Sequence, residues 1–250
     1  MKSDRKKAIL SFIQQEGQVR LNRLRDVFPE VSEMTLRRDL DALEEENLVL
    51  RTHGGAKALP ATSTANRPLP LAAGFTSSTS IARGALGFLE EDRSVYLDGG
   101  SDLLPFIDSM PDIRLFAITN APHIAIELMK KQHAEVILLG GSMNRSTMLS
   151  TGPSATNMVD LLNIDIAFMT AAGFSVESGF TYPYFNESEL KRKIIKTAKK
   201  VIMLLDSTKF NRVLPFSFAA LEDVDVIITD KKLPDEIMNE ASKHGVKVVW

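Results

Sequence analysis

The 250-residue chain has the composition of an ordinary soluble globular protein, with 44% hydrophobic residues, 25% charged residues and a formal net charge of −2. It contains no cysteine, which excludes disulfide bonds, thiolate catalysis and cysteine-based metal sites. The four histidines are too scattered for metal-ligand spacing, so we expect no metal and no cofactor. Because no apolar run is long enough to span a membrane and no signal-peptide pattern occurs, we expect a cytoplasmic protein without membrane contact.

The N-terminal residues predict three short helices followed by a strand and a turn. Apolar residues recur at helical spacing in residues 3–16 and 22–28. Ser32 is a good N-cap for a third helix, because its hydroxyl can accept a hydrogen bond from a free amide of the first turn. Residues 48–51 predict a strand, and residues 52–55 predict a turn. This order of elements is the plan of a winged helix-turn-helix.

The third helix separates its apolar residues from its polar ones. Leu36, Leu40 and Leu43 recur at i, i+4 and i+7 and predict a buried stripe. The residues that we predict to contact DNA on this helix are Ser32, Met34, Thr35, Arg37 and Arg38. The alternative is a solvated face, because Glu33–Arg37 and Arg37–Asp41 have the spacing of ordinary surface ion pairs.

The charge distribution supports the DNA interpretation, although the net charge does not. Basic residues prevail up to Arg38, whereas the acidic residues Asp39, Asp41, Glu44, Glu45 and Glu46 follow without a base. This polarity suits a helix whose N-terminal end enters the major groove and whose C-terminal end points away from phosphates.

Residues 57–75 predict a linker, because they are rich in proline, alanine and threonine and have no apolar period. We therefore expect a winged helix-turn-helix domain at residues 1–56 and a second domain at residues 76–250.

After the linker, short β-rich runs alternate with helix-length stretches, the pattern of βαβ units and a largely parallel sheet. The predicted strands are 94–98, 114–119, 135–140, 164–170, 201–206, 225–229 and 246–250, and the predicted helices are 80–90, 102–109, 121–131, 154–162, 187–199 and 234–243. The sequence therefore predicts the α/β fold class, with a Rossmann-like C-terminal domain.

Glycine and polar residues follow five of these strands, at the end where open α/β sheets bind ligands. They are Asp98-Gly99-Gly100-Ser101, Thr119-Asn120, Gly140-Gly141-Ser142, Ala172-Gly173 and Asp206-Ser207-Thr208-Lys209. One such loop is routine turn chemistry, but five in register favour a pocket for a polar ligand.

Two sets of residues carry a resemblance to a known family. The first comprises Arg5, Ile9, Ile13, Val19, Arg20, Leu21, Phe28, residues 31–40, Leu43, Glu44, Leu48, Arg51 and residues 53–56. The second comprises residues 97–101, Thr119, Asn120, residues 139–141, Gly152, Pro153, residues 179–181, Glu187, Lys191 and residues 206–210. Together they resemble the DeoR-type family of bacterial sugar-metabolism transcriptional regulators over nearly the whole chain. The resemblance implies a double-stranded DNA operator as partner and a C-terminal domain resembling the ribose-5-phosphate isomerase fold. It also implies that His53, Gly54 and Gly55 in the wing turn contact DNA.

By that resemblance, the glycine turns and helix N-termini would hold a sugar phosphate, with positive charge from Lys209 and Lys191. The implied effector contacts are Asp98, Gly99, Gly100, Ser101, Thr119, Asn120, Gly140, Gly141, Gly173, Glu187, Lys191, Asp206 and Lys209. Glu187 and Lys191 are equally compatible with an exposed i, i+4 helix pair. Asp102 stands where the family usually has a second hydroxyl residue, which leaves open whether its carboxylate excludes phosphate from the first glycine turn.

Two functions compete for this chain. One is a repressor of carbohydrate metabolism whose C-terminal domain binds a sugar phosphate and forms a homodimer or homotetramer. The other is a sugar-phosphate isomerase, because carboxylates such as Asp98 and Glu187 with Lys209 would suit proton abstraction next to a carbonyl. The N-terminal domain favours the regulator, since it serves no purpose in an isomerase. We therefore predict a regulator without catalytic residues.

Overall fold

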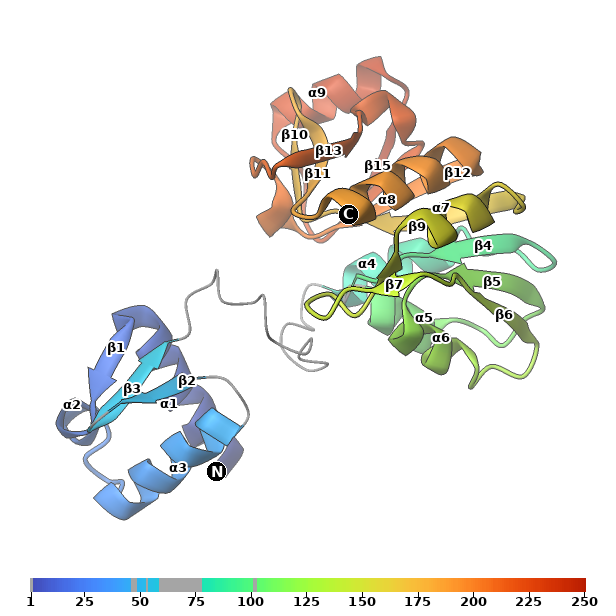
Figure 1. Ribbon diagram of the computed structural model, residues 1–250. Coiled ribbons are helices and arrows are strands. Elements are labelled where there is room, and N and C mark those ends of the chain that lie inside the picture. The colour runs from blue at the N-terminus through green and yellow to red at the C-terminus, as the bar shows by residue number, and fades with distance from the viewer. Residues whose placement is uncertain (1, 46–48, 53, 59–77, 101–102) are drawn as a thin grey trace. The chain divides into compact units, whose positions relative to one another are not determined.

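The computed structural model describes residues 2–45, 49–52, 54–58, 78–100 and 103–250. The chain divides into two compact units, one within residues 1–67 and the other within residues 68–250. Figure 1 labels the helices and strands of both. The predicted DNA contact His53, the predicted effector contact Ser101 and most of the predicted linker lie outside the described residues.

The described part of the first unit is a winged helix-turn-helix. Its helices are α1 (Lys2–Glu16), α2 (Leu21–Val27) and α3 (Glu33–Glu45), and its strands are β1 (Gln18–Arg20), β2 (Val49–Thr52) and β3 (Gly55–Ala58). β3 lies between β1 and β2 and is antiparallel to both. The core is built from Ile9 and Ile13 of α1, Leu24 of α2 and the leucine stripe of α3. The β2–β3 hairpin is the wing.

The boundary of the first unit differs from the prediction. β3 continues to Ala58, so Lys57 and Ala58, which were assigned to the linker at residues 57–75, belong to the wing. β3 can extend this far because it is paired on both sides, with Lys57 opposite Gln18 of β1 and Leu50 of β2. A strand of four residues is too short for a period-2 pattern to reveal it.

The second unit is built on a seven-stranded parallel sheet in the order β15-β14-β12-β9-β4-β5-β6. The strands are β4 (Ser94–Leu97), β5 (Leu115–Thr119), β6 (Ala134–Leu138), β9 (Ile164–Thr170), β12 (Ala198–Leu205), β14 (Val226–Thr229) and β15 (Lys247–Val249). Every neighbouring pair is parallel. The predicted strands are all present, which confirms the α/β fold class.

Helices cover both faces of this sheet, as a parallel sheet requires (Figure 1). They are α4 (Ser78–Leu86), α5 (Leu104–Ser109), α6 (Pro122–Leu128), α7 (Pro153–Val159), α8 (Phe185–Thr197) and α9 (Asp235–Lys243). One core cluster joins α4, α5 and α6 to residues such as Val95 and Leu97. The other joins α7, α8 and α9 to residues such as Tyr96 and Met203, which point to the opposite face.

Small antiparallel elements stand beside the parallel sheet, and the sequence does not predict them. β10 (Gly173–Ser175), β11 (Gly179–Tyr182) and β13 (Phe216–Ala219) form a three-stranded sheet in that order, and β7 (Ser142–Met143) pairs with β8 (Ser150–Thr151). The β7–β8 hairpin follows β6 and the β10–β11 hairpin follows β9 in the chain. Both therefore begin at the carboxyl end of the sheet.

The direction in which strands are added reverses between β4 and β9. From β4 the sheet grows through β5 to β6, and on the other side of β4 it grows through β9, β12 and β14 to β15. In open α/β sheets the crevice at the carboxyl ends of the two strands flanking such a reversal is the usual ligand site. The residues after β4 and β9 are therefore the first place to look for a site.

Candidate functional site

In the first unit, α3 has the polarity that the sequence predicts. The amide of Thr35 donates to Ser32 Oγ at 3.3 Å, so Ser32 caps the helix. Leu36 and Leu40 are fully buried, whereas the Met34 side chain is 65% exposed. The first turn of α3 is therefore accessible to a partner, as a recognition helix must be.

Arg37 and Arg38 are held differently. Arg37 Nη2 donates to Glu33 Oε1 at 2.8 Å, and Arg25 of α2 donates to the other oxygen of Glu33 at 3.4 Å. Arg38 is exposed and forms no ion pair with any described residue. The Glu33–Arg37 surface pair is thus present, whereas the expected Arg37–Asp41 pair is replaced by an ion pair of Asp41 with Arg51.

A partly buried ion pair joins α3 to α1. Arg5 Nε donates to Asp39 Oδ2 at 2.6 Å and Arg5 Nη2 donates to Asp39 Oδ1 at 3.2 Å, and Asp39 is only 2% exposed. This two-bond geometry sets the orientation of both helices, because the guanidinium and the carboxylate must be coplanar. Sequence reasoning places both residues in the family pattern but does not pair them, since they lie 34 positions apart.

Different structural constraints explain why glycine stands at positions 54 and 55 of the wing. Gly54 is exposed and has a φ of 99°, which favours glycine in the turn. Gly55 is buried, and a Cβ there would lie 2.1 Å from the carbonyl oxygen of Val19. Strand packing therefore explains Gly55 without DNA, and contact of the wing with DNA rests on Gly54 as far as the described residues go.

In the second unit, the predicted site residue Asp98 lies at the reversal between β4 and β9. Asp98 Oδ2 accepts from the Thr170 amide at 2.9 Å and from Thr170 Oγ1 at 2.7 Å. Lys191 of α8 forms an ion pair with the same carboxylate and donates to the Thr170 carbonyl oxygen at 3.0 Å. Burial raises the pKa of Asp98, but the Lys191 charge and these hydrogen bonds lower it by more, so the net pKa shift is downward.

This arrangement corrects the interpretation of Glu187 and Lys191 as an exposed helix pair. Glu187 is 2% exposed and Lys191 is 3% exposed, and the ion-pair partner of Lys191 is Asp98. Lys191 Nζ also lies 4.8 Å from the centre of the Tyr182 ring. The face of α8 that carries both residues packs inward against the sheet, so the i, i+4 spacing does not mark a solvated surface.

Glu187 joins α8 to the β7–β8 hairpin. Its Oε1 accepts from Asn144 Nδ2 at 2.9 Å and from Thr147 Oγ1 at 2.7 Å. Its Oε2 is buried and has no hydrogen-bond partner of normal geometry among the described residues, although Tyr182 lies near the carboxyl group. Burial raises the pKa of Glu187 above its ordinary value.

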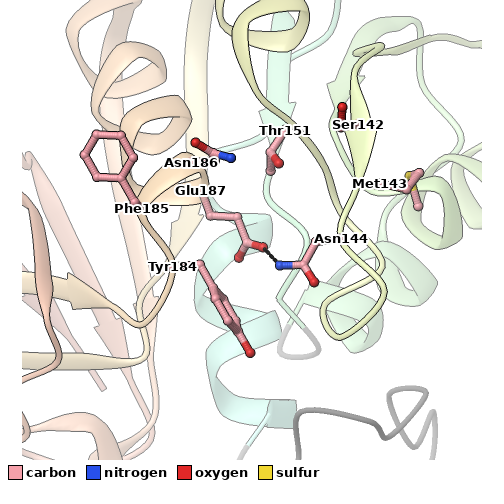
Figure 2. Close-up of a pocket in the computed structure, with 8 residues that line it drawn as sticks. All are labelled: Ser142, Met143, Asn144, Thr151, Tyr184, Phe185, Asn186 and Glu187. Carbon is pink, nitrogen blue, oxygen red and sulfur yellow. Dashed lines mark hydrogen bonds between the residues drawn. The ribbon is translucent and has the colours of Figure 1, made fainter.

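A pocket of about 340 Å³ lies beside Glu187. Figure 2 shows Asn144 and Tyr184 next to the Glu187 carboxyl group, with Asn186 and Thr151 above it. The remaining lining residues are Ser142, Met143 and Phe185. Ser142 belongs to the predicted loop Gly140-Gly141-Ser142, but Glu187 is the only lining residue that we predicted as an effector contact. The other lining residues follow no motif in the sequence.

Thr119 and Asn120, at the end of β5, are buried and hydrogen-bonded within the protein. Thr119 Oγ1 accepts from the Ala121 amide at 3.1 Å. The Asn120 side chain accepts from Tyr96 Oη at 2.9 Å and donates to the Ser150 carbonyl oxygen at 3.0 Å. These contacts hold β4, β5 and the β7–β8 hairpin together, so in this structure Asn120 supports the wall of the site.

At the end of β12, Asp206 and Lys209 form a separate polar loop. Lys209 Nζ lies 3.3 Å from Asp206 Oδ2, and the Lys209 side chain is 27% exposed. Burial raises the pKa of Asp206, but hydrogen bonds from Thr208 and the charge of Lys209 lower it by more, so the net shift is downward. Lys209 is therefore a partly accessible cation, unlike the buried Lys191.

The predicted glycines all follow strands at this edge of the sheet, and four of them, Gly99, Gly100, Gly141 and Gly173, permit packing too close for a Cβ. A Cβ at Gly100 would lie 2.5 Å from Thr170 Oγ1, and one at Gly173 would lie 2.3 Å from the carbonyl oxygen of Arg212. Gly99 donates its amide to Asp98 Oδ1 at 2.9 Å. Gly140 and Gly141 connect β6 to the β7–β8 hairpin.

No group of three histidine, aspartate or glutamate side chains in the described ranges is placed to hold a metal ion. Among the described helices, none combines the length and the apolar character needed to cross a membrane.

Comparison with known families covers both units. Residues 5–62 match the DeoR-like helix-turn-helix domain, and residues 76–231 match the DeoR C terminal sensor domain. The chain belongs to the DeoR family. DeoR-family membership makes it a transcriptional regulator with a DNA-binding helix-turn-helix domain, and the isomerase alternative is not favoured.

Relatives of the chain are also named as transcriptional regulators. The chain is similar to the HTH-type transcriptional regulator GlpR of Haloferax volcanii, with 34% identity over 87% of this chain and 86% of that protein. It is also similar to the HTH-type transcriptional repressor GlcR of Bacillus subtilis, with 29% identity over 97% of this chain and 93% of that protein. Among solved structures, ribose 5-phosphate isomerase A of Methanocaldococcus jannaschii aligns over 53% of each chain, with a TM-score of 0.39 and 15% identity.

Proposed function

We propose that this DeoR-family regulator is a repressor of genes of carbohydrate metabolism, and that a phosphorylated sugar bound by residues 78–250 controls its affinity for a double-stranded operator. The observation that carries the proposal is the buried Lys191–Asp98 pair, hydrogen-bonded to Thr170 at the reversal of strand order. Charges buried at this position of an open α/β sheet mark the crevice where such sheets bind ligands.

On the DNA side, α3 supplies the base contacts and the wing supplies backbone contacts. Met34 and Arg38 are exposed at the accessible end of the helix, and Arg37 beside them is held by Glu33. Arginine reads base edges or neutralises phosphates, and it does both through hydrogen bonds of fixed geometry. Ser32, Thr35 and Gly54 complete the proposed DNA-binding surface.

On the effector side, Lys209 is the proposed phosphate ligand. It follows the carboxyl end of β12, it is partly exposed, and the cation could exchange its contact with Asp206 for one with a phosphate. Lys191 is less suited to bind phosphate directly, because its charge is neutralised by Asp98 in the core. We assign Lys191 the role of holding α8 against the glycine turn after β4.

The proposed oligomer is a homodimer or a homotetramer. A helix-turn-helix that binds a two-fold symmetric operator does so as a dimer, which places one recognition helix on each half-site. Avidity then raises operator affinity far above that of one isolated domain.

A thermal-shift screen of the full-length chain tests the effector class. The panel comprises glycerol 3-phosphate, D-ribose 5-phosphate, D-fructose 1-phosphate and D-glucose 6-phosphate, each beside its unphosphorylated counterpart. A ligand present at a hundred times its Kd should stabilise the native state by roughly 2.7 kcal/mol. We expect at least one sugar phosphate, and none of the free compounds, to raise the Tm. Stabilisation by free sugars alone would contradict a phosphorylated effector.

A further inference from the structure

The pocket beside Glu187 has the chemistry of a site for hydroxyl groups. Its side chains are amides, hydroxyls, one carboxyl group and aromatic rings, contributed by Ser142, Asn144, Thr151, Tyr184 and Asn186 in addition to Glu187. No lysine, arginine or histidine is among the residues that line it in the described part of the chain. Amides and carboxyl groups match the donors and acceptors of a polyol, and the ring of Tyr184 offers an apolar face to its carbons.

The orphaned oxygen of Glu187 points to a ligand. Glu187 is 2% exposed, and its Oε1 takes hydrogen bonds from Asn144 and Thr147, while its Oε2 takes none of normal geometry from the described residues. A buried polar atom without a well-aligned partner is rare and unfavourable. The Tyr182 hydroxyl lies near the carboxyl group but does not reach hydrogen-bond geometry with Oε2, which leaves this oxygen able to take a donor from a ligand in the pocket. A hydroxyl group can supply that donor.

The side chains of the pocket offer phosphate no positive charge. A phosphate placed there would face the Glu187 carboxyl group, and the nearest buried cation on α8, Lys191, is already paired with Asp98. Burial raises the pKa of Glu187, which lessens the repulsion of an anion but supplies no positive charge to bind one. The first turn of α8 lines the pocket and its amides favour an anion, but the Glu187 carboxyl group already lies in that turn, so we place the phosphate of a bound ligand outside this pocket.

We infer that the pocket formed by Ser142, Asn144, Thr151, Tyr184, Asn186 and Glu187 is a polyol subsite, which binds the uncharged hydroxyl-bearing part of the effector through Glu187. This inference rests on the proposed function, because it presumes a phosphorylated sugar as effector. It divides recognition between two places: hydroxyl groups are selected here, and the phosphate is bound by a different loop, for which Lys209 is the candidate. It also removes the Gly140–Gly141 turn, which leads into this pocket, from the candidate phosphate ligands.

Calorimetric titration of the full-length chain tests the subsite. The probes are D-ribose 5-phosphate, D-fructose 1-phosphate, D-glucose 6-phosphate and inorganic phosphate, and the variants are Glu187→Gln and Asn186→Ala. Asn186 is exposed, so its replacement leaves the fold intact even if Glu187→Gln perturbs it. Glu189→Gln is the matched control, because Glu189 lies two positions away on α8 and forms a surface pair with Arg192.

We expect Glu187→Gln and Asn186→Ala to lower the affinity for the tightest-binding sugar phosphate by about tenfold or more. Glu189→Gln should change this affinity by less than about twofold. The affinity for inorganic phosphate should stay at the wild-type value in all three variants. Wild-type affinity for the sugar phosphate in both Glu187→Gln and Asn186→Ala would overturn the subsite and leave the proposed function standing. A loss of inorganic phosphate binding in Glu187→Gln would also overturn it, by placing the phosphate here. If no sugar phosphate bound to the wild type, both the proposed effector class and the proposed subsite would be wrong.

An amine-bearing probe shows whether Glu187 binds a neutral hydroxyl group or a charged ammonium group of the ligand. D-glucosamine 6-phosphate differs from D-glucose 6-phosphate by an ammonium group in place of one hydroxyl group. Equal or weaker binding of the amine supports a polyol subsite. Binding of the amine more than about tenfold tighter, lost in Glu187→Gln, would overturn it, because an ionised Glu187 would then be selecting an ammonium group.

Discussion

Lys191 and Asp98, which are 93 positions apart in the chain, form an ion pair whose side chains are 4% and 1% exposed. The pair connects the middle of α8 to the end of β4, at the reversal of strand order. Burying two charges costs desolvation energy that their attraction offsets only partly, so such a pair is weak evidence for stability alone. Its position beside the glycine turn after β4 is better explained by the site that it shapes.

Removing one partner of the Lys191–Asp98 pair should destabilise the fold, because the other charge then stays buried without compensation. Lys191→Met leaves the Asp98 carboxylate buried without a cation, so we expect the free energy of unfolding to fall by about 3–5 kcal/mol. Urea denaturation measures the change. The double variant Asp98→Asn, Lys191→Met should recover most of the loss, whereas Lys193→Met, on the same helix but in a surface pair with Asp160, should cost less than about 1 kcal/mol. A loss as large in Lys193→Met would show that the buried pair has no special role.

Arg37 and Arg38 should differ in their effect on DNA binding. Adjacent residues of a helix point about 100° apart, so we expect one to be directed at base edges and the other at phosphates. Losing a base contact should relax sequence preference by about 1–3 kcal/mol, and losing a phosphate contact should lower the salt slope by about one for all sequences alike.

Operator titrations of Arg37→Ala and Arg38→Ala across a salt series provide the measurement. Arg93→Ala, a surface arginine of the second unit that pairs with Glu90, is the control for an altered net charge. If both α3 variants kept the wild-type specificity and salt slope, these arginines would not contact DNA.

Lys209→Ala should weaken effector binding and leave operator binding unchanged. A hydrogen bond to a charged group contributes roughly 1.5–3 kcal/mol, so we expect effector affinity to fall on the order of tenfold to a hundredfold. Operator affinity without effector should stay near the wild-type value, because Lys209 lies in the second unit. Lys232→Ala, a surface lysine paired with Asp235, is the control. Unchanged effector affinity in Lys209→Ala would place the phosphate in another loop.

Asp165 should make the stability of the second unit depend on pH in the acid range. Hydrogen bonds from Lys199 and Ser94 lower the pKa of Asp165 from 3.8 to about 2. A carboxylate whose pKa is lower in the folded than in the unfolded state stabilises the fold above the unfolded value, and this stabilisation is lost as the pH falls through the folded value.

We therefore expect Asp165→Asn to lower the free energy of unfolding by roughly 1–2 kcal/mol at pH 7, a figure reduced because Lys199 is 74% exposed. Urea titrations between pH 7 and pH 2 should show the difference from the wild type shrinking below about pH 4. Asp235→Asn, at a carboxylate that is 84% exposed, should show no such trend. A difference that stayed constant down to pH 2 would mean that Asp165 acts through packing.

The large elements of this fold are predictable from the sequence because their apolar patterns are long. β9 runs over Ile164–Thr170 as predicted, and the leucine stripe of α3 is buried. The short strands are not predictable from the sequence, because β7 and β8 have two residues each and so few residues show no periodicity. Sequence alone therefore misses the hairpin that delivers Asn144 and Thr147 to Glu187.

The candidate site is predictable in position but not in its contacts. Glycines and polar residues after strands locate Asp98, Asn120 and Lys209 at the carboxyl edge of the sheet. The burial of Lys191 is not predictable in this way, because an i, i+4 spacing from Glu187 fits a surface pair and an inward face equally well. Which one occurs depends on the way α8 packs against the sheet, and that is a tertiary property.

Control of operator binding by a sugar phosphate is measurable as operator affinity in the presence and absence of the effector. Fluorescence anisotropy of a labelled operator, obtained by selection from random duplexes with the full-length chain, gives the Kd with and without each sugar phosphate of the panel. We predict that at least one changes the Kd by about tenfold or more, and that Lys209→Ala abolishes this change without altering the Kd of the free protein. An operator Kd that no sugar phosphate changes, although one of them binds the protein, would contradict the account.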